Sequence, residues 1–232
     1  MKRTTLIALA ALCVCPLHAA ERPTASSREK EAADAADWQE EATRDGITIY
    51  SRLRSGSGLK EYKAVGLIEA TPASVFAVID DTEAYPRFMP YTSECRILKR
   101  EKGTVLAYQR LELPLVSDRD YTLRSTHETW IGNDGVIYRI RWQPANDLGP
   151  AVKPGVQRVS VCEGGWLLEP EGAGATRATY SIFTDSGGTL PPMLANSGSR
   201  IAIRKVYEAI RKQVKDPKYS SARSSGGPAG SQ

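Results

Sequence analysis

Leu113-Pro-Leu-Val-Ser-Asp-Arg-Asp-Tyr-Thr-Leu-Arg-Ser-Thr-His-Glu-Thr-Trp130 is the segment that decides the fold, because it runs from an apolar turn through a charge cluster into a long alternating strand. Side chains of a strand point alternately to opposite faces. One face carries Tyr121, Leu123, Ser125 and His127, and the other carries Thr122, Arg124, Thr126 and Glu128. The second face is the more charged and is predicted to face solvent. The same alternation places Arg119 at the start of the inward face.

An inward-pointing Arg119 needs partners, because a buried cation is costly unless it is paired. Asp118 and Asp120 flank it in the sequence. One interpretation is a structural ion pair that closes the turn. The other is an arginine that lines an internal site.

Alternating segments of the same kind recur along the chain. They are expected at residues 47–53, 59–69, 92–100, 104–113, 119–131, 135–143, 156–168 and 174–184. Gly-containing turns separate them, at Lys102-Gly103 and at residues 132–135 and 171–174. Strands joined by such turns predict an antiparallel meander. Residues 144–155 carry three prolines and are expected to form an exposed loop.

Helices are expected at both ends of this meander. Residues 28–43 are rich in Ala and Glu, and Thr71-Pro72 is a good start for a second helix. A short helical piece is expected at 82–88. The last helix runs from 191 to 215, with apolar residues at helical spacing, and residues 196–199 weaken its first turns enough to predict a break or a bend there. An amphipathic helix after a run of strands must bury its apolar stripe on the sheet, which predicts an α+β fold.

The inner faces carry medium-sized and polar residues, and the chain has only three phenylalanines. This composition suits a mostly apolar pocket with a few polar groups, although a filled core would fit the pattern as well.

Residues 1–20 have the pattern of a cleaved secretory signal peptide: Lys2-Arg3, a short apolar run and Ala19-Ala20. We therefore expect a periplasmic or secreted protein. Residues 21–27 are expected to form a disordered linker, 28–215 one domain, and 216–232 a disordered tail. Loss of Lys2 and Arg3 lowers the formal net charge from +4 to +2, which does not favour nucleic-acid binding.

The residues beyond the signal peptide offer little for catalysis. They contain one histidine, His127, and two cysteines, Cys95 and Cys162, which we expect to stay separate. A zinc site needs three or four N or S ligands, so no metal or cofactor is predicted. His127, with Ser125 two residues away, is the one acid–base candidate.

The central segment also resembles the turn-and-strand signature of START domains, the StAR-related lipid-transfer family. The resemblance rests on Pro114 with Val116–Tyr121, on Trp38, Asp45-Gly46-Ile47, Tyr50-Ser51-Arg52, Asp80, Tyr85 and Met89-Pro90, and on Gly187-Gly188 before Leu190-Pro191. These pieces span residues 38 to 215 in the order that the family has them.

The resemblance implies a helix-grip fold, in which a curved antiparallel sheet wraps a long C-terminal helix and encloses one lipid beneath it. It implies binding and transfer of a lipid or other hydrophobic molecule without chemical change. Cavity-lining residues are then expected at Arg119, Tyr121, His127, Tyr138, Trp142, Tyr180, Leu194 and Ile201. In some family members a buried ion pair deeper in the pocket contacts the ligand. Here Ser125 stands at the inward position where the arginine of that pair would fall, so the resemblance does not specify the headgroup chemistry.

Two alternatives stay open beside lipid transfer. One is an enzyme of cyclase or hydrolase type with His127 as acid or base, and the other is a module whose groove holds a partner protein. The C-terminal helix carries seven cations between residues 200 and 218. They either keep its outer face solvated or let it touch an anionic membrane transiently. We expect a monomer.

Overall fold

The structure is a computed structural model that describes residues 38–54, 58–114, 116–185, 187 and 192–220, with only the backbone described for 192–195. The predicted signal peptide, the linker, residues 28–37 of the first predicted helix and residues 221–232 of the tail lie outside this range.

A 10-stranded sheet forms the body of the fold. Its strands are β1 (Gln39–Arg44), β2 (Ile47–Leu53), β3 (Lys60–Ile68), β4 (Thr92–Glu101), β5 (Thr104–Leu111), β6 (Arg119–Gly132), β7 (Gly135–Pro144), β8 (Gln157–Arg158), β9 (Val161–Glu171) and β10 (Ala175–Asp185). The order is β1-β2-β3-β10-β9-β7-β6-β5-β4, with antiparallel neighbours, and β8 pairs in parallel with β6. The predicted antiparallel meander is confirmed, except that the strand expected at 156–168 is divided into β8 and β9.

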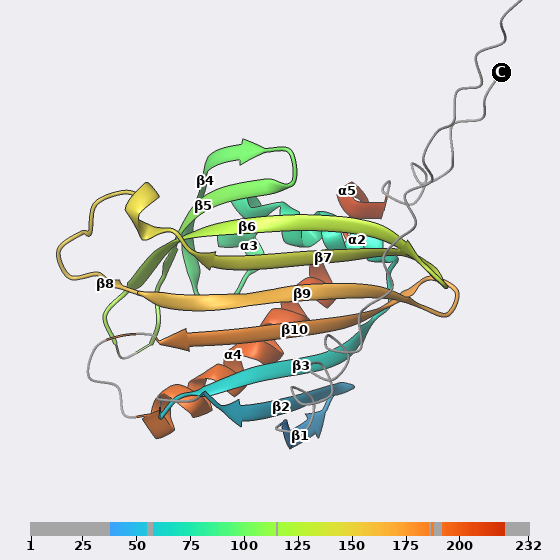
Figure 1. The fold of residues 1–232 in the computed structure, drawn as a ribbon, viewed down its shortest axis with the longest axis horizontal. Coiled ribbons are helices and arrows are strands. Elements are labelled where there is room, and N and C mark those ends of the chain that lie inside the picture. The colour runs from blue at the N-terminus through green and yellow to red at the C-terminus, as the bar shows by residue number, and fades with distance from the viewer. Residues whose placement is uncertain (1–37, 55–57, 115, 186, 188–191, 221–232) are drawn as a thin grey trace, which may run out of the picture. The chain divides into compact units, whose positions relative to one another are not determined.

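The helices α2 (Pro72–Asp80), α3 (Tyr85–Phe88), α4 (Pro192–Gln213) and α5 (Pro217–Ser220), with the 3-10 turn η1 (Thr82–Ala84), lie against one face of the sheet. A second 3-10 turn, η2 (Asn146–Leu148), packs on the other face, against β6. Figure 1 shows α4 crossing behind β3, β9 and β10, with α2 and α3 behind β6 and β7. The predicted α+β fold, a curved antiparallel sheet around a long C-terminal helix, is confirmed.

The start of α2 follows from its sequence. Thr71 has an extended backbone, and its hydroxyl oxygen accepts a hydrogen bond from the Ser74 amide at 3.3 Å. Pro72 occupies the first turn, where no backbone donor is needed. Val75, Val78 and Ile79 then face the core. The helix ends at Asp80, whose side chain is among those that line the candidate site.

The C-terminal half of α4 is fixed to the sheet by Tyr207. Its side chain is fully buried, and its single hydroxyl proton is shared between the carbonyl oxygens of Ala64 and Ala178, which lie 3.0 and 2.7 Å from the hydroxyl oxygen. Gly66 makes this possible, because a Cβ there would lie 2.9 Å from the tyrosine ring. The helix is continuous through residues 196–199, so the break considered from the sequence does not occur.

The helix expected at 28–43 is wrong for residues 39–43, which belong to strand β1. Their Ala and Glu content favours a helix in isolation, but pairing with β2 along Glu40–Tyr50 and Arg44–Ile47 overrides that weak preference. Glu41 is held there by Ser51, whose hydroxyl donates to it at 2.6 Å. Tertiary pairing therefore decides the state of this segment.

Most of the loop at 144–155 is exposed as expected, at residues 147, 148 and 151–155, but its base is packed. Its base lies against the outer face of β6, where the Thr122 amide donates to Asn146 Oδ1 at 2.8 Å and the Ala145 amide donates to the Thr122 carbonyl at 2.8 Å. Gly149 packs so closely that a Cβ would lie 1.8 Å from Thr122 Oγ1. Thr122 and Asp120 are therefore buried, although the sequence pattern placed their face in solvent.

The ordered chain also continues past the predicted start of the tail. Residues Pro217–Ser220 form α5, and Tyr219 is buried with its hydroxyl donating to Asp81 Oδ2 at 2.8 Å. Tyr219 and the Lys218–Asp81 ion pair hold this polar segment beside α2, although its Ser-, Gly- and Pro-rich surroundings predicted disorder.

Candidate functional site

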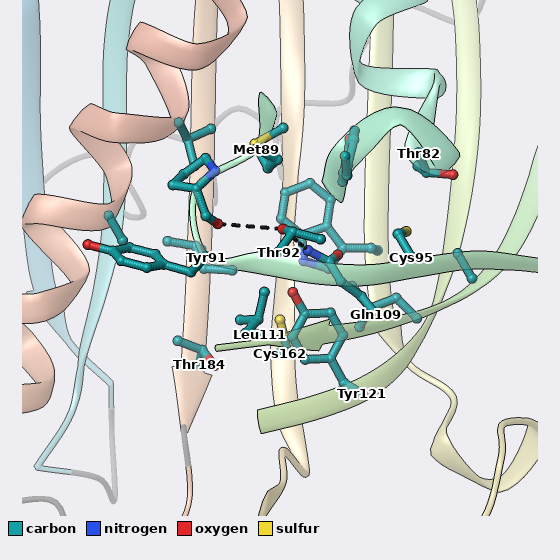
Figure 2. Close-up of a pocket in the computed structure, with 18 of the residues that line it drawn as sticks. Thr82, Met89, Tyr91, Thr92, Cys95, Gln109, Leu111, Tyr121, Cys162 and Thr184 are labelled. Carbon is teal, nitrogen blue, oxygen red and sulfur yellow. Dashed lines mark hydrogen bonds between the residues drawn. The ribbon is translucent and has the colours of Figure 1, made fainter. Parts of the chain in front are cut away.

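A cavity of about 470 Å³ lies between the sheet and α4. This volume falls within the usual range for small-molecule sites. Every strand from β4 to β7, together with β9, β10 and α4, contributes to its wall. Figure 2 shows part of this wall, with Tyr121, Cys162 and Thr184 among the labelled side chains. The hollow expected beneath the last helix is present.

The inward face of β6 supplies the longest continuous part of the wall. Alternate residues line the cavity, namely Arg119, Tyr121, Leu123, Ser125 and His127. The face predicted from the alternation is therefore confirmed. Cross-strand pairing places Val105 on one side of Ser125 and Trp142 on the other, and both also line the cavity.

Five of the eight residues predicted to line the cavity lie on its wall: Arg119, Tyr121, His127, Trp142 and Tyr180. Whether they contact a ligand stays a prediction. The side chain of Leu194 lies outside the described residues.

Tyr138 and Ile201 were predicted to line the cavity, but neither lies on its wall. Tyr138 has the inward parity of Trp142 but lies beyond the end of the cavity, where its ring stacks on Phe76 with 4.8 Å between centroids. Ile201 is 53% exposed. At 100° per residue, the helix turns it away from the face that carries Ala202, Ile203 and Val206.

The sequence interpretation missed much of the wall. The additional residues come from the α2–β4 connection, from β4 and β5, and from the turn before β6: Thr82, Tyr85, Met89, Pro90, Tyr91, Thr92, Cys95, Gln109, Leu111, Leu113, Pro114 and Val116. Figure 2 shows several of these labelled beside Tyr121. Met89-Pro90 and Pro114 belong to the segments that resemble START domains, and this resemblance is the sequence feature from which they could have been predicted as wall residues.

Small residues on α4 leave room for the cavity. Gly198, Ser199 and Ala202 line it, and a Cβ added at Gly198 would meet nothing within 4 Å. Gly198 and Ser199 have a low helix propensity, but their small size keeps the space beneath α4 open. Polar contacts hold this half of α4, including Arg200 with Glu41 at 3.0 Å and the Tyr62 hydroxyl with the Asn196 carbonyl at 3.0 Å.

Trp142 lies over Gly164 of β9. A Cβ at Gly164 would lie 2.6 Å from the indole ring and 2.2 Å from the Ser181 carbonyl oxygen. We predict that Gly164→Ala lowers the free energy of unfolding by about 1–3 kcal/mol, because the strand and the indole must both shift. Urea unfolding checks this. Ala107→Gly changes the cavity wall without a clash and is the reference for the loss of stability. Gly172→Ala would not serve, because Gly172 has a positive φ of 57°, which strains an alanine. A neutral Gly164→Ala would contradict the close packing.

Arg119 does not pair with the aspartates that flank it, which corrects the ion-pair interpretation. Asp118 accepts from Arg110 Nε at 2.9 Å. Asp120 accepts from Arg158 Nε at 2.6 Å and from the Tyr108 hydroxyl at 3.1 Å. Alternation explains this, because residues 118 and 120 point to the face opposite Arg119.

His127 lies at the other end of the β6 row. Its Nδ1 is 3.6 Å from Asp80 Oδ1, and its ring packs edge-on against Phe76. Burial lowers the pKa of His127 below its ordinary value, with Asp80 opposing that effect, so the imidazole is neutral at neutral pH. Among the described residues, no hydrogen bond joins this side chain to a hydroxyl group, and Asp80 is held by two bonds from Arg100 Nη1 at 2.9 Å.

The sequence family described as polyketide cyclase/dehydrase and lipid transport matches residues 68–211. The chain belongs to this family. An uncharacterised protein of Pseudomonas aeruginosa is 32% identical over 164 residues, 70% of this chain and 79% of that protein. A phosphatidylcholine transfer protein of Rattus norvegicus is 29% identical over 177 residues, 75% of this chain and 82% of that protein.

Solved structures of this family share the fold. A StAR-related lipid transfer protein from Xanthomonas axonopodis has a TM-score of 0.70 at 27% identity, covering 77% of this chain and 99% of that one. Human StAR-related lipid transfer protein 5 has a TM-score of 0.68 at 19% identity, covering 82% of this chain and 92% of the other. The resemblance to START domains is confirmed.

The two cysteines of this START domain are free and buried, and both line the cavity. Burial raises the pKa of the Cys95 thiol and of the Cys162 thiol to about 12. Cys162 lies beside Thr184 and Trp142, which partly oppose this rise. Both side chains are therefore neutral thiols at physiological pH.

We predict that these thiols react slowly with iodoacetamide while the protein is folded. At pH 8.5 an ordinary thiol is about half ionised, and a pKa of about 12 lowers the reactive thiolate roughly a thousandfold. Because the folded thiols stay neutral while unfolded thiols ionise, the folded state loses stability relative to the unfolded state as pH rises above roughly 8.5. Mass spectrometry should find little alkylation in buffer and complete alkylation in urea. Rapid labelling of the folded protein would contradict the burial.

The described residues contain no cluster of three or more His, Cys, Asp or Glu side chains placed to hold a metal ion. Within the same part of the chain, no helix has the length and apolarity needed to cross a bilayer.

Proposed function

We propose that this START domain binds one lipid or similarly hydrophobic molecule in the cavity beneath α4 and carries it between membranes without changing it chemically. The observation that carries the proposal is the cavity of about 470 Å³, walled mostly by apolar side chains. Family membership supports it, since relatives of this chain include a phosphatidylcholine transfer protein and a StAR-related lipid transfer protein.

The physical task is to keep apolar surface out of water. Exposure costs about 0.8 kcal/mol per CH₂ group, so a chain of sixteen carbons faces roughly 13 kcal/mol in free solution. A cavity that replaces water by Leu123, Ile140 and Val206 removes most of this barrier. Transfer then requires only that part of the wall opens at the membrane.

The N-terminal half of α4 is the part of the wall that we propose opens. Tyr207 fixes the other half through a buried hydrogen bond shared between two carbonyl oxygens. The half above the cavity is held by polar contacts, among them the Arg200–Glu41 ion pair, whose partly exposed arginine is screened by water, so the pair costs little to break. In the other half, two residues before Tyr207, Lys205 contacts the Tyr91 hydroxyl at 2.9 Å.

Contact with an anionic membrane through α4 and α5 is part of the proposal. Lys212 and Lys215 are exposed, and the apolar Ile201 is exposed beside Lys205. Such a surface can lie on anionic headgroups. Vesicles containing phosphatidylglycerol should retain the protein at low salt and release it at high salt, and no retention at low salt would overturn this part.

The function itself is tested by transfer. Donor vesicles carrying fluorescent phosphatidylcholine are mixed with acceptor vesicles, with and without the full chain, and native mass spectrometry examines the purified protein for bound lipid. We expect a one-to-one lipid complex and transfer faster than the spontaneous rate. Transfer at the spontaneous rate together with an empty cavity would overturn the proposal. Export, predicted from residues 1–20, is also a proposal, and fractionation of expressing cells tests it.

A further inference from the structure

One cation on the cavity wall has no counter-charge. At the start of β6, Asp118 pairs with Arg110 and Asp120 pairs with Arg158. Both carboxylates near Arg119 in the sequence are therefore neutralised on the opposite face of the strand. Within the described residues Arg119 forms no ion pair.

Arg119 is nevertheless almost completely buried, with 4% of its surface exposed, and it lines the cavity. Its Nη1 group donates to the Ser117 carbonyl, whereas its Nε group has no hydrogen-bond partner. A buried charge without a partner is expensive, and native proteins rarely leave one unless a ligand completes the site. This guanidinium is thus an incomplete site that opens onto the cavity.

Two further buried polar atoms on the wall have a thiol sulfur beside them but no oxygen or nitrogen acceptor. Of the five buried side-chain polar atoms without a partner in the described part of the chain, three line the cavity: Arg119 Nε, Trp142 Nε1 and Thr82 Oγ1. Trp142 and Thr82 lie beside the thiols of Cys162 and Cys95, which are weak acceptors. Arginine and tryptophan can only donate. The wall therefore favours a ligand that brings acceptor atoms.

The carboxylate on the wall, Asp80, does not satisfy Arg119. It lies beside His127 and is bound by Arg100. His127 follows Arg119 by eight residues on the same strand, which corresponds to about 27 Å of extended chain. The uncompensated cation and the carboxylate thus lie at opposite ends of the β6 row, with Leu123 and Ser125 between them.

We propose that the molecule carried in the cavity is an amphiphile with an oxyanion headgroup, a carboxylate or a phosphate, bound by the Arg119 guanidinium. Its apolar tail runs along β6 toward His127. This inference rests on the proposed function and narrows its ligand class. An oxyanion supplies the missing acceptors, and a charged hydrogen bond in a water-poor cavity is stronger than a neutral one.

The test compares ligands that differ only at the headgroup. The full chain is titrated with palmitate, hexadecyl phosphate, hexadecanol and sodium phosphate alone, and affinities are measured by calorimetry. We expect palmitate and hexadecyl phosphate to bind about tenfold or more tightly than hexadecanol. Equal affinities for palmitate and hexadecanol would overturn the proposal. Sodium phosphate binding as tightly as hexadecyl phosphate would also overturn it, because the apolar cavity would then contribute nothing.

Variants assign the effect to one residue. Arg119→Met should bind palmitate no better than hexadecanol, while keeping hexadecanol affinity, and Arg119→Lys should keep part of the preference. Arg124→Met is the matched control, since Arg124 is exposed on the outward face of the same strand, and it should keep the whole preference. A preference that survives in Arg119→Met overturns the assignment.

If Arg119→Met does not fold, Arg119→Lys takes its place: it should lower the preference for palmitate over hexadecanol, and an unchanged preference would overturn the assignment. Failure of this inference is distinct from failure of the proposed function. Binding of hexadecanol and palmitate alike leaves lipid transfer intact, whereas no binding of any amphiphile and no transfer of phosphatidylcholine removes both.

Discussion

Replacing Asp120 with asparagine is expected to lower the free energy of unfolding by about 3–5 kcal/mol. Asp120 is fully buried and accepts from Arg158 at 2.6 and 3.2 Å and from the Tyr108 hydroxyl at 3.1 Å. Asparagine keeps the shape but removes the charge, so Arg158 becomes a largely buried cation without a counter-ion. Urea unfolding at pH 7, followed by circular dichroism, measures the loss.

The neighbouring carboxylate provides the control. Asp118 pairs with Arg110, but both side chains keep about a quarter or more of their surface in solvent, at 25% and 30%. Water screens such a pair, so Asp118→Asn should cost only about 0–1 kcal/mol. Similar losses for the two variants would show that burial of Asp120 does not set its contribution.

The Asp120 network also shapes the wall around Arg119. Arg158 Nη2 donates to the Pro150 carbonyl at 2.9 Å, and Asn146 Nδ2 donates to the Val159 carbonyl at 2.8 Å. These bonds hold the loop after β7 against the outer face of β6. Val159 itself lines the cavity. Charge on the outer face thus positions residues on the inner one.

The local sequence pattern was sufficient to predict the antiparallel meander and which face of β6 points into the cavity. Glycine turns and period-2 alternation are set by neighbouring residues, so they are visible in the sequence. β1 was not predictable in this way, because its residues are polar and become a strand only by pairing with β2. The packed base of the loop after β7 was missed for the same reason, since Asn146 and Thr122 are 24 residues apart.

The cavity wall could be predicted only in part. Alternation tells which face a side chain occupies but not how far along the strand the cavity extends, so Tyr138 was placed in it wrongly while Trp142 was placed correctly. Arg119 was identified as inward, but its missing counter-ion was not, because the sequence cannot show that Asp120 is taken by Arg158, 38 residues away.

Replacing Ser125 with phenylalanine is expected to abolish most lipid binding while the protein stays folded. Ser125 lies in the middle of the β6 row, between the cavity-lining Val105 and Trp142. A ring there occupies space that the ligand needs. Displacing about three methylene groups costs roughly 2.4 kcal/mol, or about fiftyfold in affinity. The transfer assay and native mass spectrometry should both record this loss.

The stability of the same variant separates a filled cavity from a damaged fold. Because the ring enters an existing void and gains contacts there, urea unfolding should show a free energy equal to or above that of the wild type. Thr126→Phe adds the same ring on the exposed outer face, one residue along the strand, and should leave transfer unchanged. A folded Ser125→Phe protein that transfers lipid at the wild-type rate would mean that the ligand does not occupy this cavity, since the ring and an acyl chain cannot share the space between Val105 and Trp142.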